Sequence, residues 1–571
     1  MKKKFRMGGS VSEKERPERA NGVTRRNFLG RMSGAAAAAL AGSVVAGSAL
    51  LEPKPAAAAP KPPAPPAPFD PSGTNLRQRC TDARLTRLDA AQLAFVRPLP
   101  SIVNSGEEND YGGTRIANFS KGLPHNGLGE VDPAAYNALL KALATGSNSD
   151  FEGIPLGGSK PLRNPQAGLA FDLEGPDSHH LALRPAPRID SAEAAGEAAE
   201  LYWMALARDV HFSDYATNPT TLAAAADLSA FSDFRAPKSG GAVTPQTLFR
   251  GNTPGDLNGP YLSQFLLLDI PYGSLTVTQH QQTVLPGFDY MTGYADWLNI
   301  QNGGPSGPDA FDSAPRHIRN GRDLGQYVHV DALYEAFLNA CLILLGMGAP
   351  FDAGNPYSGA KKQDAFTTFG APHILSLLTE VAARALKAVW YQKWFVHRRL
   401  RPEAFGGLLH NRVTGTANYS LHPQILNSTA LTRIFSRFGT YLLPQAFPEG
   451  SPLHPSYGAG HATVAGACVT ALKAWFDESF VIPNPVVASA DGLSLVPYVG
   501  APLTVGGELN KVAANIASGR NFAGIHWRTD FSESARLGEA VTIGILQEQK
   551  ATYNETASFT LTWFDGTTIT I

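Results

Sequence analysis

A histidine that follows a glycine-rich turn is the first candidate for chemistry in this 571-residue sequence. His461 lies in the segment HPSYGAGHATVAGAC, residues 454–468, directly after Gly458-Ala459-Gly460. So little side-chain bulk lets the backbone approach a ligand closely. The apolar run that follows predicts a buried helix, which places His461 near a helix N-terminus, where free N–H groups and the helix dipole favour an anion. Two interpretations stay open: an acid–base beside a bound oxyanion, or a histidine that only caps a tightly packed helix.

Two cations stand at the end of a second predicted helix, in the stretch KWFVHRRLRP. Lys393 and Arg401 are eight residues apart, so on an ideal helix they point about 80° apart. They can face one site only if the helix loosens before Pro402. The alternative is a cationic cluster that merely complements the helix C-terminus.

A third stretch, ASGRNFAGIHWRTD, adds Arg520 and His526. The sequence predicts that one helix ends at Ser518-Gly519 and that another, capped by Asp530, begins after His526. The three stretches together supply three cations, two imidazoles and a close backbone N–H at Gly460. They lack the carboxylate or thiolate set that a divalent metal requires. Such a cage fits a tetrahedral oxyanion such as phosphate or vanadate.

The order of these residues, Lys-x7-Arg-Pro, then Gly-His, then Arg-x5-His, resembles the acid phosphatase and vanadium haloperoxidase superfamily. Four segments resemble more closely the vanadium-dependent bromoperoxidases of the red-algal and cyanobacterial type: LYWMALARDVHFSDY, KWFVHRRLRPEAFGG, HPSYGAGHATVAGA and GRNFAGIHWRTD. The similarity covers most of residues 75–571. It implies a mainly α fold of two four-helix bundles with long ordered loops and a short C-terminal β-hairpin.

The resemblance also implies a cofactor and a reaction. Vanadate would be bound through the distal imidazole nitrogen of His526, with three cations and one backbone N–H around its oxygens: Lys393, Arg401, Arg520 and Gly460. His461 would serve as acid–base for hydrogen peroxide, and Lys393 would make the bound peroxide more reactive. Bromide and iodide would be oxidised to hypohalous acid, with small organic molecules as acceptors, by a homo-oligomer.

Two alternatives use the same cage. An acid phosphatase would employ His526 as nucleophile and His461 to protonate the leaving group. A protein that only binds an oxyanion would leave His461 without a role.

Three positions refine the resemblance. Ala459 stands where the family usually has a serine that donates to vanadate, and one such hydrogen bond to a charged group is worth about 1.5–3 kcal/mol. His454 matches a histidine typical of bromoperoxidases, and Trp390 stands one turn before Lys393, where red-algal enzymes tend to carry arginine. We expect both to lie near the halide or around the cage. The alternatives are core packing for Trp390 and a loop hydrogen bond for His454.

Several helices are expected to position these residues. Asp132-Pro133 and Gly146 bound one helix, and Asp190 with Glu193 starts another that reaches about Asp209. Further helices are predicted over Val330–Met347 and, as the longest, from Pro372 towards Arg399, with Pro402 as its stop. Val210–Arg322 predicts long ordered loops that carry a substrate channel or an oligomer contact. Asp565-Gly566 predicts a two-residue hairpin turn within Ser558–Ile571.

The N-terminus predicts export. Residues 1–59 carry Thr24-Arg25-Arg26-Asn27-Phe28-Leu29, then an apolar run and Ala56–Ala59, as in a twin-arginine signal peptide. Residues 60–75 form a Pro/Ala-rich linker, and 76–571 the α-helical body. We therefore expect a periplasmic or extracellular protein with no stable membrane insertion after signal removal.

Composition excludes other classes. Charged residues make up 17% and hydrophobic residues 43%, which favours a globular protein over a disordered one. The eleven Lys/Arg and four Asp/Glu of residues 1–59 leave a mildly acidic body, which argues against nucleic-acid binding. The three cysteines do not make a disulfide framework, and Cys341 and Cys468 read as buried packing residues.

Overall fold

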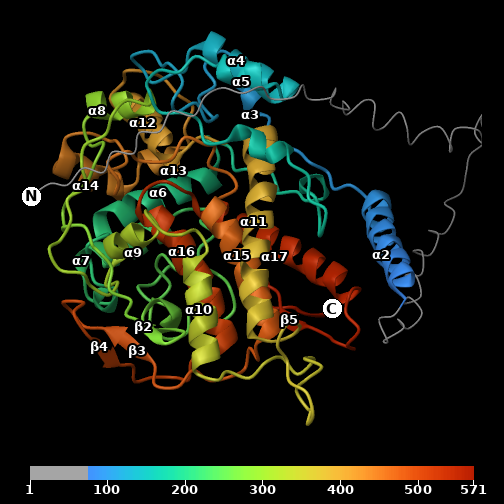
Figure 1. Ribbon diagram of the computed structural model, residues 1–571. Coiled ribbons are helices and arrows are strands. Elements are labelled where there is room, and N and C mark those ends of the chain that lie inside the picture. Colours follow the sequence, from blue (N-terminus) through green and yellow to red (C-terminus); the bar gives the residue numbers. More distant parts are fainter. Residues whose placement is uncertain (1–74) are drawn as a thin grey trace, which may run out of the picture. The chain divides into compact units, whose positions relative to one another are not determined.

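The computed structural model describes residues 75–571, and this part of the chain is mainly helical (Figure 1). The predicted signal peptide and nearly all of the linker lie outside the described residues, so the division at residues 59 and 75 stays a prediction. The helices are α2 (Leu76–Val96), α3 (Glu107–Asp110), α4 (Pro133–Thr145), α5 (Asn148–Glu152), α6 (Ala192–Ala207), α7 (Pro219–Ser229), α8 (Tyr294–Gln301), α9 (Gly321–Tyr327), α10 (Glu335–Gly346), α11 (Ala371–Tyr391), α12 (Pro402–Val413), α13 (Pro423–Leu426), α14 (Thr429–Phe438), α15 (Gly460–Trp475), α16 (Val505–Phe522) and α17 (Arg528–Lys550).

Helix α15 is the centre of one bundle, because α11, α16 and α17 all pack against it (Figure 1). Every α15 residue except His461 is buried. Its contact with α17 depends on glycine at two crossing points. A Cβ on Gly466 would lie 2.0 Å from the Ala535 carbonyl oxygen, and one on Gly538 would lie 2.0 Å from the Thr463 carbonyl oxygen. Backbone-to-backbone approach of this kind fixes the start of α15 against the start of α17.

A second group of helices forms around α6, against which α7, α13 and α14 pack, and α6 also contacts α16. Helix α6 is buried over nearly its whole length. The Ala-rich sequence of this helix, AEAAGEAAELYWMALA, allows such close packing while the few large side chains, Tyr202 and Trp203 among them, fill the core. The two groups share one large hydrophobic core.

Three small antiparallel ribbons complete the described chain: β1 (Ile270–Tyr272) with β2 (Leu275–Val277), β3 (Val486–Ala488) with β4 (Leu495–Pro497), and β5 (Thr560–Thr562) with β6 (Thr568–Thr570). The C-terminal hairpin is therefore confirmed. Its turn is longer than predicted, since Thr562 pairs with Thr568 and leaves five residues between the strands.

Some helix boundaries could be predicted from the local sequence alone, and others could not. Asp132 caps α4 through its side chain, and Gly146 ends it with φ +62°, both as predicted. The cap of α6 is Ser191 rather than Asp190, because the Ser191 hydroxyl accepts from the Ala194 amide. Helix α10 begins at Glu335, later than the predicted Val330.

Two predictions around the site residues were wrong. Pro402 does not stop a helix; it opens α12, where a proline in the first turn costs no hydrogen bond. Helix α16 does not end at Ser518-Gly519 but runs on through Arg520 to Phe522. As an α-helix α11, with 21 residues, is shorter than α17, with 23, but it continues directly as a π-helix to His397, so the helical run predicted from Pro372 towards Arg399 is the longest of the described chain.

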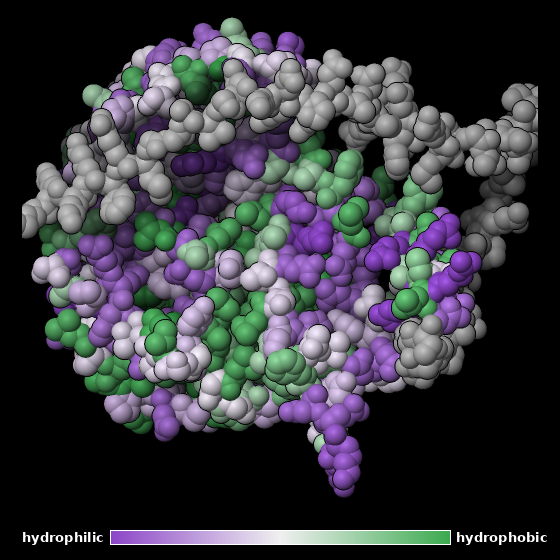
Figure 2. All heavy atoms as spheres, in the orientation of Figure 1, coloured by the Kyte–Doolittle hydropathy of each residue, from purple (hydrophilic) through white to green (hydrophobic). Residues whose placement is uncertain are grey.

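The region Val210–Arg322 contains more regular structure than predicted, including α7, α8 and the β1–β2 ribbon, joined by long ordered segments. Cys341 and Cys468 are buried and unpaired, as expected, and Cys80 is an exposed free thiol. Within residues 75–571 no helix is long and apolar enough to cross a membrane. Figure 2 shows one face of the molecule, with a hydrophilic hollow in its upper half.

Candidate active site

The N-terminus of α15 presents His461 to a partly open site. Ala459 is the N-cap, Gly460 is the first helical residue, and the predicted placement of His461 at a helix start is confirmed. His461 Nε2 lies 3.0 Å from Asp331 Oδ1, and its Nδ1 makes no hydrogen bond within the described residues. Burial and the charge of Arg520 lower the pKa of His461, while Asp331 acts in the opposite direction.

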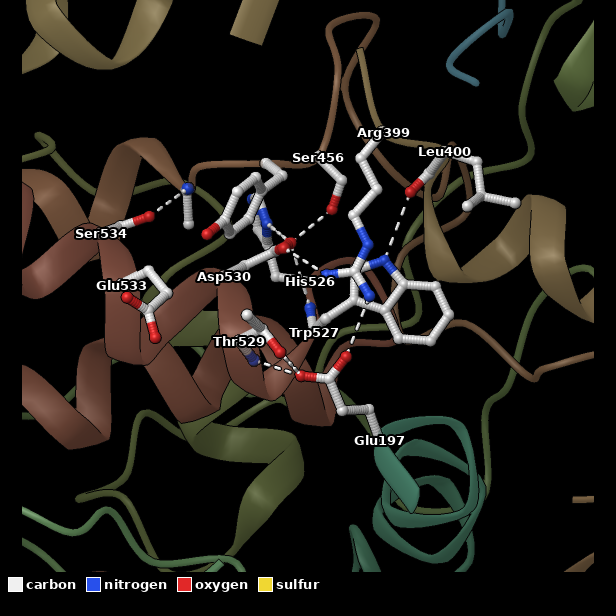
Figure 3. Close-up of polar contacts among 12 residues, drawn as sticks. Glu197, Arg399, Leu400, Ser456, His526, Trp527, Thr529, Asp530, Glu533 and Ser534 are labelled. Atoms are coloured by element: carbon white, nitrogen blue, oxygen red, sulfur yellow. Dashed lines mark hydrogen bonds and ion pairs between the residues drawn. The ribbon is translucent and has the colours of Figure 1, made fainter. Parts of the chain in front are cut away.

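His526 lies in the short connection between α16 and α17. Its Nδ1 lies 2.8 Å from Asp530 Oδ2, and the same carboxylate accepts from the Ser456 hydroxyl and from Arg399 (Figure 3). Burial, and then the charges of Arg401, Lys393 and Arg520, hold the pKa of His526 well below its ordinary value. The imidazole is therefore neutral, with its proton on Nδ1 facing Asp530 and its lone pair on Nε2.

Lys393 is fully buried and donates to two backbone carbonyls, those of Pro455 at 2.7 Å and Ser456 at 3.0 Å. It reaches them because α11 loosens: the chain continues from Tyr391 as a π-turn, Gln392–His397. The predicted loosening before Pro402 is confirmed. Burial, then the charges of Arg401 and Arg520, lower the pKa of Lys393 well below its ordinary value.

Arg401 joins two histidines of the cluster. Its Nη1 lies 2.9 Å from His526 Nε2, and its Nη2 lies 2.9 Å from His454 Nδ1. The ring of Trp390 packs on His454 with centroids 4.8 Å apart, and Lys393 Nζ lies 5.7 Å from the centroid of Trp390. His454 thus makes a hydrogen bond that holds Arg401. Trp390 does both things that were predicted as alternatives: it packs against the hydrophobic core and it lies beside the cluster. Burial, and then Arg520, lower the pKa of Arg401 to about 9.

Arg520 approaches from the last turn of α16. One guanidinium nitrogen donates to the Val328 carbonyl at 2.6 Å, while Nε is buried and has no hydrogen-bond partner in the part of the chain that the structure describes. Burial lowers the pKa of Arg520 to about 10, against the opposing charges of Asp331 and Glu449. Hydrogen bonds join the three stretches of sequence into one cluster. Arg401 contacts His454 and His526, and Lys393 contacts the carbonyls of Pro455 and Ser456. The charges of Lys393, Arg520 and His461 also act on the pKa of His526.

The cations of this cluster differ from the other buried cations nearby. Arg399 pairs with Glu197 and Asp530, and Arg528 pairs with Glu200. Within residues 75–571, Lys393, Arg401 and Arg520 have no carboxylate oxygen within 4.0 Å, although all three are buried. Such charges are unfavourable unless an anion joins them. The described residues also contain no group of three or more His, Cys, Asp or Glu side chains placed to hold a metal cation.

Two acidic partners of the histidines were missed by reasoning from the sequence. Asp331 is 130 residues from His461 and lies in an irregular segment, so no spacing signal linked them. The sequence predicts Asp530 as the cap of the new helix, and this is wrong, because Trp527 is the N-cap of α17 and Asp530, at the third helical position, accepts from the Trp527 amide. The spacing of four residues between Asp530 and His526 was a usable signal, because two residues so spaced around a helix start can contact each other.

Known proteins match the chain over most of its length. A family model described as the VCPO second helical-bundle domain matches residues 374–555. The vanadium-dependent bromoperoxidase of Corallina officinalis is 40% identical over 87% of this chain and 99% of its own length, and that of Ascophyllum nodosum is 39% identical over 82% and 87%. The homohexameric structure of the second vanadate-dependent bromoperoxidase of Ascophyllum nodosum superposes with a TM-score of 0.84 at 32% identity, covering 87% of this chain and 91% of that one. The chain therefore belongs to the family of vanadium-dependent bromoperoxidases.

Proposed function

We propose that this protein is a vanadate-dependent haloperoxidase that oxidises bromide and iodide with hydrogen peroxide to hypohalous acid. The observation that carries the proposal is the cluster of three buried cations, none of which contacts a carboxylate within residues 75–571, beside the neutral imidazole of His526. Membership of the family over nearly its full length favours this reaction over the phosphatase alternative.

The residues present fit a tetrahedral oxyanion. Arg520 Nε is a buried donor without a partner, and the Gly460 amide, at the first position of α15, makes no hydrogen bond within the described residues. Lys393 and Arg401 add buried positive groups that contact no carboxylate of the described residues within 4.0 Å, although Asp530 and Glu403 act on them from farther away. When bound, vanadate supplies a Lewis-acidic vanadium(V) centre that activates hydrogen peroxide towards halide without changing oxidation state.

His526 is the residue that would attach the vanadium. Asp530 holds the proton of the imidazole on Nδ1, so the lone pair lies on Nε2, where Arg401 now donates to it and where vanadium would take its place. Arg399 and Ser456 donate to that carboxylate, so the imidazole ring is held in place on its Nδ1 side, opposite the nitrogen that would bind vanadium (Figure 3). An outer partner of this kind sets both the tautomer and the orientation of a ligating histidine.

His461 is the residue that would move protons. Its Nε2 is engaged by Asp331, and its Nδ1 is free to accept a proton from hydrogen peroxide and return it. In the site without an anion, burial and Arg520 lower the pKa of His461, which favours the neutral imidazole that can act as a base. Lys393 would withdraw charge from the bound peroxide oxygen.

The halide range rests on Ala459 and His454. Chloride is the hardest of the three halides to oxidise, and Ala459 offers no hydroxyl to withdraw charge from the bound oxygens. We infer that iodide and bromide are oxidised and that chloride is oxidised poorly. His454 and Trp390, which lie beside the cluster, are the residues that we expect near the halide. Small organic molecules would accept the resulting hypohalous acid.

Export and assembly belong to the same proposal. The twin-arginine pattern of residues 24–29 supports a periplasmic or extracellular enzyme, and a homohexameric relative supports a homo-oligomer. N-terminal sequencing of the secreted protein and light scattering of the purified protein test these two points separately. A cytoplasmic, uncleaved chain contradicts the first, and a monomer contradicts the second.

The decisive experiment is bromination of a phenolic dye by purified protein with hydrogen peroxide and bromide, before and after addition of vanadate. Activity that appears only with vanadate is the expected result. The same samples are assayed with an aryl phosphate, which apo-protein hydrolyses slowly at most and which vanadate should block. Fast phosphate hydrolysis without bromination at saturating vanadate would establish the phosphatase instead.

A further inference from the structure

The segment Val328–Asp331, between α9 and α10, touches two members of the cluster at once. Its first residue accepts a hydrogen bond from Arg520 through the Val328 carbonyl at 2.6 Å. Its last residue, Asp331, holds His461 at 3.0 Å. A shift of this one segment would therefore reorient both Arg520, on α16, and His461, on α15.

Between these two contacts, His329 anchors the segment. Its Nε2 lies 2.7 Å from Glu449 Oε1, and its ring stacks on Phe447 with centroids 3.7 Å apart and an angle of 7° between the planes. The Arg520 guanidinium lies on the same aromatic ring, with its carbon 5.7 Å from the centroid of Phe447. His329 therefore helps to fix the Phe447 ring, and the Phe447 ring in turn contacts Arg520.

The segment Val328–Asp331 can reach Arg520 because α9, which precedes it, lies very close to α16. A Cβ on Gly519 would lie 2.8 Å from the Leu324 carbonyl oxygen and 3.0 Å from a methyl group of Val328. Gly519 directly precedes Arg520, so this close approach brings the end of α9 within reach of the guanidinium. Phe447 belongs to a separate small apolar cluster with Ala523 and Ile525, next to His526.

We propose that His329 is a positioning residue for the anion site: by its stacking on Phe447 and its bond to Glu449 it fixes the segment that orients Arg520 and His461. The proposal rests on the proposed function, since the anion it serves is vanadate. The ring contact carries most of the effect, because Phe447 touches Arg520 directly, while the bond to Glu449 fixes the position of the His329 ring.

Three variants test the proposal. His329→Ala removes both contacts, His329→Phe keeps a stacking ring without the hydrogen bond, and Val330→Ala changes a neighbour whose surface is 76% exposed. Vanadate affinity is measured by equilibrium dialysis with elemental analysis of bound vanadium, together with the vanadium-51 NMR signal of the bound ion and the melting temperature.

We expect His329→Ala to weaken vanadate binding about tenfold to a hundredfold, the range for loss of an outer support, and to shift the NMR signal. His329→Phe should recover most of the affinity, and Val330→Ala should match wild type. Wild-type affinity in His329→Ala would overturn the proposal, as would equal losses in the Ala and Phe variants at unchanged melting temperature. If wild-type protein itself binds no vanadate, the proposed function fails instead, so the two failures are distinguishable.

Discussion

Asp530→Asn tests most directly whether Asp530 sets the tautomer of His526. Asp530 is fully buried and accepts from His526 Nδ1 at 2.8 Å, the Trp527 amide at 3.2 Å, Arg399 at 3.0 Å and the Ser456 hydroxyl (Figure 3). An amide has one oxygen and one NH2 group. If its oxygen faces His526, its NH2 faces Arg399, and in the reverse orientation the NH2 faces the protonated Nδ1.

Either orientation removes the negative charge and at least one charge-assisted hydrogen bond, which is worth about 1.5–3 kcal/mol. With the NH2 towards the imidazole, His526 is forced to move its proton to Nε2, the nitrogen needed for vanadium. At about 1.4 kcal/mol per factor of ten, vanadate affinity should fall about tenfold to a hundredfold.

The assay is equilibrium dialysis of vanadate against purified protein, with bound vanadium measured by elemental analysis. Glu533→Gln is the matched control. It makes the same acid-to-amide change nearly one turn further along α17, where Glu533 pairs with Arg184 at 3.0 Å near the surface. We expect its affinity to equal wild type. An Asp530→Asn protein that binds vanadate as tightly as wild type would refute the assigned tautomer of His526.

Further predictions follow from the same contacts. His526→Ala should abolish vanadate binding, whereas His461→Ala should keep bound vanadium and lose most bromide oxidation; equal vanadium content in wild type and His526→Ala would contradict the assignment. Ala459→Ser should tighten vanadate binding or raise bromide turnover by up to about tenfold, the equivalent of ~1.4 kcal/mol, and wild-type oxidation of chloride as fast as bromide would show that another group replaces the hydroxyl. Lys393→Met should remove most of the stabilisation that vanadate gives, because a positive group facing the anion is lost; a rise in melting temperature on adding vanadate as large as that of wild type would contradict this role of Lys393. Burial and the neighbouring cations lower the pKa of His397 to about 3 in the folded protein. Between this pKa and the pKa of about 6.5 in the unfolded chain, only the unfolded chain binds the proton. The free energy of unfolding therefore decreases as the pH falls through this range. His397→Phe should therefore reduce this decrease between pH 6.5 and 4 by about 1.4 kcal/mol per pH unit, measured by urea titration, and an unchanged slope would contradict it.

Local signals in the sequence were sufficient for several elements that carry the site. Asp132 and Gly146 bound α4 as their types predict, and the small residues after Gly460 form the buried helix α15. The residues of the cluster were found because their types and order are unusual, and the structure places Arg401 directly against His526.

Other features depended on contacts distant in sequence. The π-turn Gln392–His397 lets Lys393 reach the carbonyls of Pro455 and Ser456, more than 60 residues away in sequence, and nothing in KWFVHRRLRP alone requires it. Asp331 could not be linked to His461 for the same reason. Pro402 was misread because a proline suits both a helix stop and a first helical turn, and only the preceding extended residue, with φ −82° and ψ 154°, decides between them.

The three buried cations also make a small ion a participant in folding. A chain that folds without an anion must dehydrate Lys393, Arg401 and Arg520 close to one another, so the last stage of folding favours whatever tetrahedral oxyanion the medium supplies. By mass action, an anion at 100 times its dissociation constant adds about 2.7 kcal/mol to the stability of the folded state. Inorganic phosphate can therefore act as a temporary template that vanadate later replaces. Refolding yield should rise with the phosphate concentration of the buffer, and that yield is a property of this site rather than of the chain as a whole.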